Sequence, residues 1–213
     1  MIFITGDTRS KKMIKILQEY GMGRMVIDRL IKLYPREPWG FDNGAYRDWV
    51  GEKEFDEDAF LRRLEMAYQL GIPYLAVVPD IVAGGENSLE FSLGWLKRLP
   101  EWPWYLAVQD GMKLERVSQI IKPFAGIFLG GTDKFKATAW YWCKLAHQHG
   151  KKFHYARAGT PRKVIHARKV GSDSCDSAGP LYSIERFNWF LSAWIEHNEQ
   201  IDFWGPEIWS ARP

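Results

Sequence analysis

Short apolar segments alternate with longer amphipathic segments along most of the chain. The short segments predict β-strands, placed roughly at 2–5, 24–28, 39–42, 74–79, 104–109, 125–129, 152–157 and 172–176. The longer segments carry apolar residues at helical spacing and predict helices, placed roughly at 9–20, 29–34, 56–70, 86–98, 113–121, 134–149, 161–169 and 183–197.

Residues at the ends of these segments support the assignment. Thr160 followed by Pro161 is typical of a helix start, with a hydroxyl that caps the helix and proline in its first turn. Three glycines are placed to end helices just before a strand: Gly71, Gly150 and Gly171.

Eight strands that alternate with eight helices predict an α/β fold, a compact single-domain (β/α)8 TIM barrel over residues 1–197. An open, doubly wound sheet is the alternative, because the number of strands does not by itself close a barrel. The 213 residues are few for a barrel, for which ~250 is typical, so short loops are expected. The aromatic C-terminal tail, 198–213, is expected to pack on the barrel.

The composition sets broad limits on location and chemistry. The chain lacks any apolar run near the ~20 residues that span a membrane, and its start lacks signal-peptide features. A cytoplasmic protein with no membrane partner is therefore expected. Its two cysteines, Cys143 and Cys175, are too few for a disulfide framework or a cysteine-rich zinc site. The net charge of +3 permits a polyanionic partner without requiring one.

Polar residues and one pair of glycines stand where the predicted strands end. The polar residues are Asp42, Asn43, Asp80, Gln109, Asp110, Arg157 and Asp176, and the glycines are Gly130 and Gly131. In a parallel barrel the carboxyl ends of all strands meet on one face, which is where such barrels carry out catalysis.

Each of these residues also has an ordinary structural explanation. An aspartate before glycine, such as Asp110, is a common turn residue, and Asp42-Asn43-Gly44 resembles a turn as well. Taken together, several acids at equivalent strand ends favour a site, because burying unpaired charge is costly. Two facing aspartates, Asp42 and Asp176, suit substitution at a sugar carbon, and the neighbouring amides suit a planar ligand such as a purine.

Other reaction types have less support in the sequence. Of the five histidines only His154 lies on a predicted strand, and no pair has convincing zinc spacing. The Gly130-Gly131 pair belongs to neither a phosphate-binding loop with lysine nor a dinucleotide fingerprint. No metal site and no cofactor are expected.

Six ordered segments resemble the tRNA-guanine transglycosylase superfamily, whose members are TIM barrels that exchange guanine for a 7-deazaguanine base. The resemblance covers roughly residues 39–178 and is carried by Phe41-Asp42-Asn43-Gly44-Ala45-Tyr46, Val78-Pro79-Asp80, Ala107-Val108-Gln109-Asp110-Gly111, Gly130-Gly131, Ala158-Gly159-Thr160-Pro161 and Gly171-Ser172-Asp173-Ser174-Cys175-Asp176.

The resemblance implies a role for each site residue. Asp176 would attack the anomeric carbon, and Asp42 would act as general acid and base. The substrate-binding residues would be Asp80 and Gln109, which bind the purine edge, the Gly130 and Gly131 backbone, Tyr46, which stacks on the base, and Asn43 and Arg157.

Two departures from the tRNA enzymes favour a DNA-modifying branch. After Asp176 the chain lacks the cysteines of the family's zinc subdomain, and Ser177-Ala178-Gly179-Pro180-Leu181 replaces an arginine-containing segment. The sequence is more similar to the DpdA-like 7-deazaguanine DNA transglycosylases, found in phages and modification clusters. This similarity implies DNA as partner, with RNA as the alternative, a base such as preQ0, and a possible helicase or ATPase partner.

Further readings stay open. The same acids could serve a nucleoside or glycoside hydrolase, with water as acceptor, or the chain could be a non-catalytic nucleic-acid-binding subunit. Basic residues near the expected active face could hold phosphates or could simply form a solvated surface. They are Lys11, Lys12, Lys15, Arg47, Lys134, Lys136, Arg157, Arg162 and Lys163.

Overall fold

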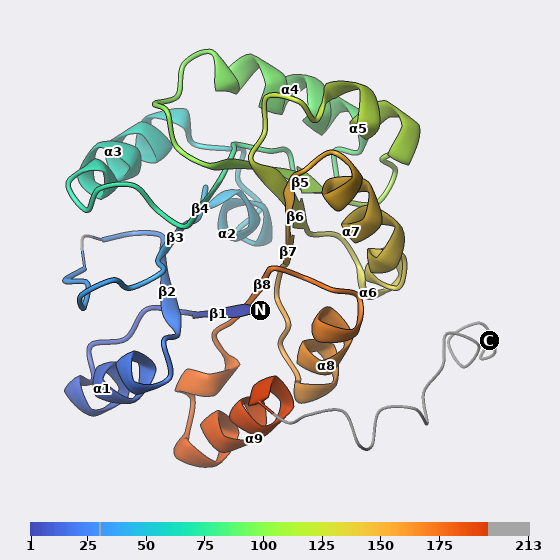
Figure 1. The fold of residues 1–213 in the computed structure, drawn as a ribbon. Helices are drawn as coiled ribbons and strands as arrows, with labels where there is room; N and C mark the ends of the chain where they lie inside the picture. Colours follow the sequence, from blue (N-terminus) through green and yellow to red (C-terminus); the bar gives the residue numbers. More distant parts are fainter. Residues whose placement is uncertain (30, 196–213) are drawn as a thin grey trace.

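The computed structural model describes residues 1–29 and 31–195, and in it eight parallel strands close into a barrel in chain order (Figure 1). The strands are β1 Ile2–Thr5, β2 Gly23–Val26, β3 Gly40–Phe41, β4 Leu75–Val77, β5 Trp104–Val108, β6 Gly126–Leu129, β7 Lys152–Tyr155 and β8 Ser174–Ser177. Closure is made by β8 pairing with β1, with Ile2 opposite Ser174 and Thr5 opposite Ser177. The predicted (β/α)8 barrel is confirmed, and the open sheet is excluded.

Most helices surround the strands in an outer layer, whereas α2 (Ala45–Val50) appears within the ring of strands in the view of Figure 1. The helices are α1 Lys11–Glu19, α2 Ala45–Val50, α3 Glu57–Tyr68, α4 Glu86–Leu96, α5 Leu114–Ile120, α6 Asp133–Lys136, α7 Ala139–Gln148, α8 Pro161–Lys169 and α9 Ile184–Ile195, with a short 3-10 helix, η1, at Gly179–Leu181. The expected cap at Thr160 is present, since its side chain accepts a hydrogen bond from the Lys163 N–H.

Two hydrophobic clusters follow from the alternation of side chains along each strand. The larger cluster lies between strands and helices and includes Phe3, Phe41 and Leu106. The smaller one fills the barrel interior with residues such as Ile4 and Tyr105. Gly126 makes room for Tyr105, because a Cβ at Gly126 would lie 2.4 Å from the Tyr105 ring.

The predicted helix at 29–34 is wrong, since residue 29 and residues 31–34 are not helical. This loop instead wraps around a buried ion pair. The Arg24 guanidinium is held by the Glu37 carboxylate through Nε at 2.7 Å, and it also donates to the Lys32 carbonyl at 2.8 Å. Glu37 in turn accepts from the Tyr34 N–H at 2.9 Å, so the Lys32 carbonyl and the Tyr34 N–H are both satisfied without a helix.

Two other helix boundaries differ from the prediction. The segment 134–149 is divided into α6 and α7, because Thr138 lies between them and its hydroxyl donates to the Phe135 carbonyl at 2.6 Å. The turn expected at Asp42-Asn43-Gly44 leads into α2, which the hydrophobic pattern did not indicate.

The expected tail, 198–213, lies outside the described residues. Within residues 1–29 and 31–195, no helix is both long and apolar enough to cross a bilayer.

Candidate active site

Three carboxyl groups gather at the carboxyl ends of the strands. Asp42 follows β3, Asp80 follows β4 and Asp176 lies within β8. Burial raises the pKa of Asp42, and the negative charge of Asp176 raises it further. Burial, together with the negative charge of Asp42, raises the pKa of Asp80 to about 6. The fold therefore brings together the three acids that were predicted from positions more than thirty residues apart.

Asp176 is held through one oxygen. Its Oδ1 accepts from His154 Nε2 at 2.9 Å and from the Arg157 backbone N–H at 2.9 Å. Its Oδ2 has no hydrogen-bond partner among the described residues, and the side chain is 19% exposed. Such a carboxylate is oriented by the protein on one side and open to a reacting partner on the other.

Asn43 supports Asp80 through its amide nitrogen. Its Nδ2 donates to Asp80 Oδ1 at 2.7 Å and to the Val78 carbonyl at 2.8 Å. Its Oδ1 accepts from the Ala45 N–H at 2.9 Å, at the start of α2. Both Nδ2 protons are thus engaged within the protein, and a direct contact of Asn43 with substrate, which stays a prediction, would use Oδ1.

Gln109 is also engaged by the protein. Its Oε1 accepts from the Ala83 N–H at 2.6 Å, and its Nε2 donates to the Ile81 carbonyl at 2.7 Å. The side chain is buried and fixes the loop that follows Asp80. One Nε2 proton stays available for a ligand, so Gln109 can contribute less to the purine edge than the resemblance implies.

Glycine is needed in the Gly130-Gly131 turn because the backbone at Gly131 lies close to the side chain of Asp110. Gly131 has a φ of +72°, and a Cβ there would lie 2.6 Å from Asp110 Oδ2. Asp110 binds the Thr132 N–H and hydroxyl, both at 2.7 Å, which agrees with the structural role considered for it. The Gly131 carbonyl accepts from the Arg157 guanidinium at 2.8 Å.

Tyr46 is the residue expected to stack on the base, and one face of its ring is covered by the side chain of Arg157. The Arg157 guanidinium lies 4.2 Å from the Tyr46 ring centroid. Trp49, one turn further along α2, has its ring 5.9 Å from that of Tyr46 at an angle of 31°. Arg157 would have to move for a base to stack on the face of Tyr46 that it covers. Arg157 has a φ of +51°, a strained value for a residue other than glycine.

Two residues near Asp176 were not predicted for the site. His154 stands out in the sequence only as the histidine on a strand. Its neighbours Phe153 and Tyr155 face the helices, so alternation along β7 places His154 on the inner face. Lys136 was considered a surface cation, which is wrong, since it is 3% exposed. Its Nζ donates to the Ala156 carbonyl and lies 5.3 Å from the Tyr155 ring centroid. Nothing in the sequence indicates that Lys136 is buried while Lys134, two residues before it, is exposed.

Burial, together with the charge of Arg157, lowers the pKa of Lys136 from an ordinary value near 10.5 to about 7. Between these two values the unfolded chain binds a proton that the folded chain lacks, so stability rises with pH across this window. Below it, the folded protein carries the full cost of burying the charge.

Lys136→Met is therefore expected to stabilise the protein at pH 6 by about 2 kcal/mol and to remove most of the rise towards pH 10. Urea unfolding at pH 6, 8 and 9.5 measures this, with Lys134→Met, an exposed lysine on the same helix, as the matched control. An unchanged pH dependence in Lys136→Met would contradict the assignment.

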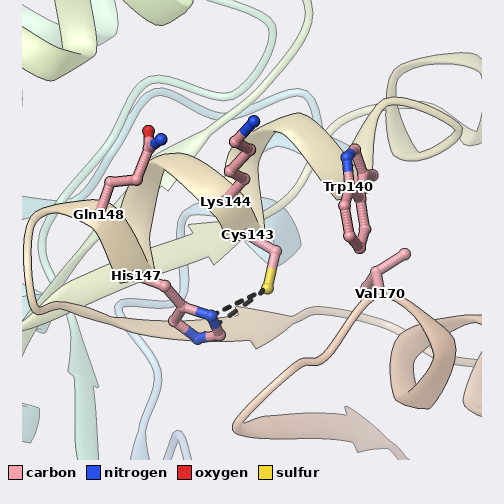
Figure 2. A pocket seen from close by; sticks show the side chains of 6 residues that line it. All are labelled: Trp140, Cys143, Lys144, His147, Gln148 and Val170. Atoms are coloured by element: carbon pink, nitrogen blue, oxygen red, sulfur yellow. Dashed lines mark hydrogen bonds between the residues drawn. The ribbon is translucent and has the colours of Figure 1, made fainter.

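A hollow of about 500 Å³ beside α7 is a separate feature (Figure 2). Cys143 and His147 lie on the same side of the helix there, and His147 Nε2 contacts Asp173 Oδ2 at 3.0 Å. Asp173 precedes β8 and so lies at the opposite end of that strand from the carboxyl end. Burial raises the pKa of the Cys143 thiol to about 12, which disfavours the thiolate needed for nucleophilic chemistry. The hollow therefore has no part in the candidate active site.

The fold and the site together define a closed parallel (β/α)8 barrel that carries a cluster of three aspartates at the carboxyl ends of its strands. No protein-family model and no curated protein matches the chain. Solved structures do match. A citrate lyase from Burkholderia xenovorans LB400 has a TM-score of 0.52 and 12% identity, over 95% of this chain and 79% of that one. RipC from Yersinia pestis has a TM-score of 0.53 and 9% identity, over 94% of this chain and 98% of that one. At these identities the likeness shows the fold alone.

Proposed function

We propose that this protein exchanges guanine for a 7-deazaguanine base in DNA through a covalent sugar–Asp176 intermediate. The observation that carries the proposal is the arrangement of Asp176 and Asp42. One carboxylate is oriented with a free oxygen, and the other lies close enough for the two charges to interact. Retaining substitution at an anomeric carbon needs such a nucleophile and such a proton carrier.

In the first step Asp176 Oδ2 attacks the anomeric carbon, and the bond from this carbon to the guanine nitrogen breaks. Asp42, protonated, gives its proton to the departing base. The raised pKa of Asp42 suits this role, because its neutral form persists to higher pH than that of an exposed aspartate.

In the second step the incoming base loses its ring proton to Asp42 and attacks the same carbon, and the ester to Asp176 breaks. Two displacements at one carbon retain its stereochemistry. Asp80 is the polar group best placed to select the base. Asn43 fixes its Oδ1, while Oδ2 has no hydrogen-bond partner among the described residues. That oxygen can accept from the N–H groups of a purine edge.

The choice of DNA rests on the missing zinc and arginine segments. Fewer of the surface cations are available to bind phosphates than the sequence indicated, because two of them form ion pairs with aspartates. Arg47 is paired with Asp28, and Lys163 is paired with Asp133. In a duplex the target base must leave the stack to reach Asp176. The proposal includes a cytoplasmic location and leaves a helicase or ATPase as the partner that could open the duplex.

The test is transfer of labelled preQ0 into a guanine-containing oligodeoxynucleotide. The purified protein is expected to incorporate label into DNA, and Asp176→Ala is expected not to. Asp133→Ala, which removes an acid whose side chain is 76% exposed, serves as the matched control and is expected to stay active.

Other outcomes point elsewhere. Label in an RNA oligonucleotide but not in DNA would replace DNA by RNA as the substrate. Release of guanine without incorporation would indicate a hydrolase. Binding of DNA without release or incorporation, alike in wild type and Asp176→Ala, would indicate a non-catalytic subunit.

A further inference from the structure

A row of polar side chains runs through the interior of the barrel to Asp176. Ser174 and Asp176 are two residues apart on β8 and so point to the same face. His154 on β7 is in register with Ser174. Its Nδ1 lies 2.8 Å from Ser174 Oγ, and its Nε2 lies 2.9 Å from Asp176 Oδ1.

The direction of these hydrogen bonds follows from the acceptor. An ionised carboxylate can only accept, so Nε2 of His154 carries a proton and donates it to Asp176. In the neutral ring Nδ1 then accepts from the Ser174 hydroxyl. His154 is 0% exposed and is stacked on Phe128, with ring centroids 4.8 Å apart and an angle of 7°. Ring position and tautomer are both fixed.

We propose that His154 is a positioning residue that fixes Oδ1 of Asp176, so that Oδ2 alone attacks the sugar. The inference rests on the proposed function. It assigns to the reaction a residue that touches neither base nor sugar. The Arg157 N–H is the second donor to the same oxygen, so Oδ1 is held from two sides.

The two donors also matter in the second displacement. In the covalent intermediate Oδ2 is bonded to the anomeric carbon, and Oδ1 is the carbonyl oxygen of the ester. When the Oδ2–carbon bond breaks, its electron pair returns to the carboxylate, and negative charge reappears on Oδ1. Donors already aimed at this oxygen stabilise the charge as it develops. His154 is therefore expected to accelerate breakdown of the intermediate by stabilising this charge, and its formation by orienting Oδ2.

Amide variants separate this role from simple packing. Glutamine places its Nε2 near the position of the histidine Nε2, whereas asparagine reaches only as far as Nδ1. His154→Gln is expected to keep kcat within about 10-fold of wild type, since a donor to Asp176 remains. His154→Asn and His154→Phe are expected to lose about 100-fold in kcat, with little change in KM for DNA.

The measurements are kcat and KM for DNA in steady-state base exchange, together with the single-turnover rate of adduct formation. Tyr155→Phe, a change of the next residue on β7, is the matched control and is expected to behave as wild type. Equal activity in wild type and His154→Phe would overturn the inference. So would equal losses in all three His154 variants, or losses confined to KM, because a packing role predicts those.

Crystal structures of His154→Gln and His154→Phe test the same point without the reaction. The Asp176 carboxylate is expected to keep its orientation in the glutamine variant and to rotate in the phenylalanine variant. An unmoved carboxylate in His154→Phe contradicts the inference, whether or not the protein exchanges bases. Absence of exchange in the wild type would instead refute the proposed function, and the structures would still decide on His154.

Discussion

Replacing Asp176 with asparagine is expected to lower kcat for base exchange by about 10⁴-fold or more and to abolish the covalent adduct. The amide is a poor nucleophile, and the reaction has no other route through an aspartyl ester. Asparagine keeps an oxygen that can accept from His154 and from the Arg157 N–H, so the fold is expected to survive. The loss would then be chemical and not structural.

Two measurements check this result. Mass spectrometry of acid-quenched wild-type reactions is expected to show a sugar-bearing peptide containing Asp176, absent from the variant. Thermal unfolding of both proteins is expected to agree closely. Asp133→Asn, the same exchange at an exposed acid on α6, controls for the lost charge. An adduct that persists in Asp176→Asn would place the nucleophile elsewhere and end the proposed mechanism.

The second large effect is expected for Asp42→Asn, at about 10²- to 10⁴-fold in kcat. Asparagine cannot give a proton to the departing guanine or take one from the incoming base. In wild type, exchange is expected to fall as pH rises through the raised pKa of Asp42, because the protonated acid disappears. That limb of the pH–rate profile is expected to vanish in the variant.

A substrate that needs no acid distinguishes proton transfer from simple disruption of the site. DNA containing 7-methylguanine carries a positively charged base, which can leave without being protonated. Adduct formation by Asp42→Asn is expected to be far closer to wild type on this substrate than on guanine. An equal deficit on both substrates would show that Asp42 orients the site and transfers no proton.

The sequence predicted the barrel because the strand signal is local. Apolar runs such as Leu75–Val77 and Trp104–Val108 are bounded by turn residues, and their spacing leaves room for one helix each. The helix expected at 29–34 was wrong because a distant contact decides that loop. Arg24, on β2, is satisfied by the Glu37 carboxylate and the Lys32 carbonyl, and no periodicity reports such an arrangement.

The acids of the site could be predicted for a related reason. Asp42 and Asp80 each follow a strand, and Asp176 is the last residue but one of β8; a closed parallel barrel places all such positions on one face. Their roles remain predictions. What the pattern could not show is which polar atoms are still available to a ligand. Gln109 is hydrogen-bonded to the loop at Ala83, and Asn43 is hydrogen-bonded to Asp80 and to the start of α2.

By itself, then, the sequence determined the order of the strands, most of the helices and the acids at the strand ends, since these depend on neighbours along the chain. The tertiary structure decided that the sheet closes, that Lys136 is buried, and that His154 holds Asp176. Closure depends on the pairing of β8 with β1, and the contact of His154 with Asp176 depends on the pairing of β7 with β8. The burial of Lys136 depends on the packing of α6 against Tyr155 and Ala156. The partners come from segments separated by a helix or by the whole chain, and only packing brings them within hydrogen-bond distance.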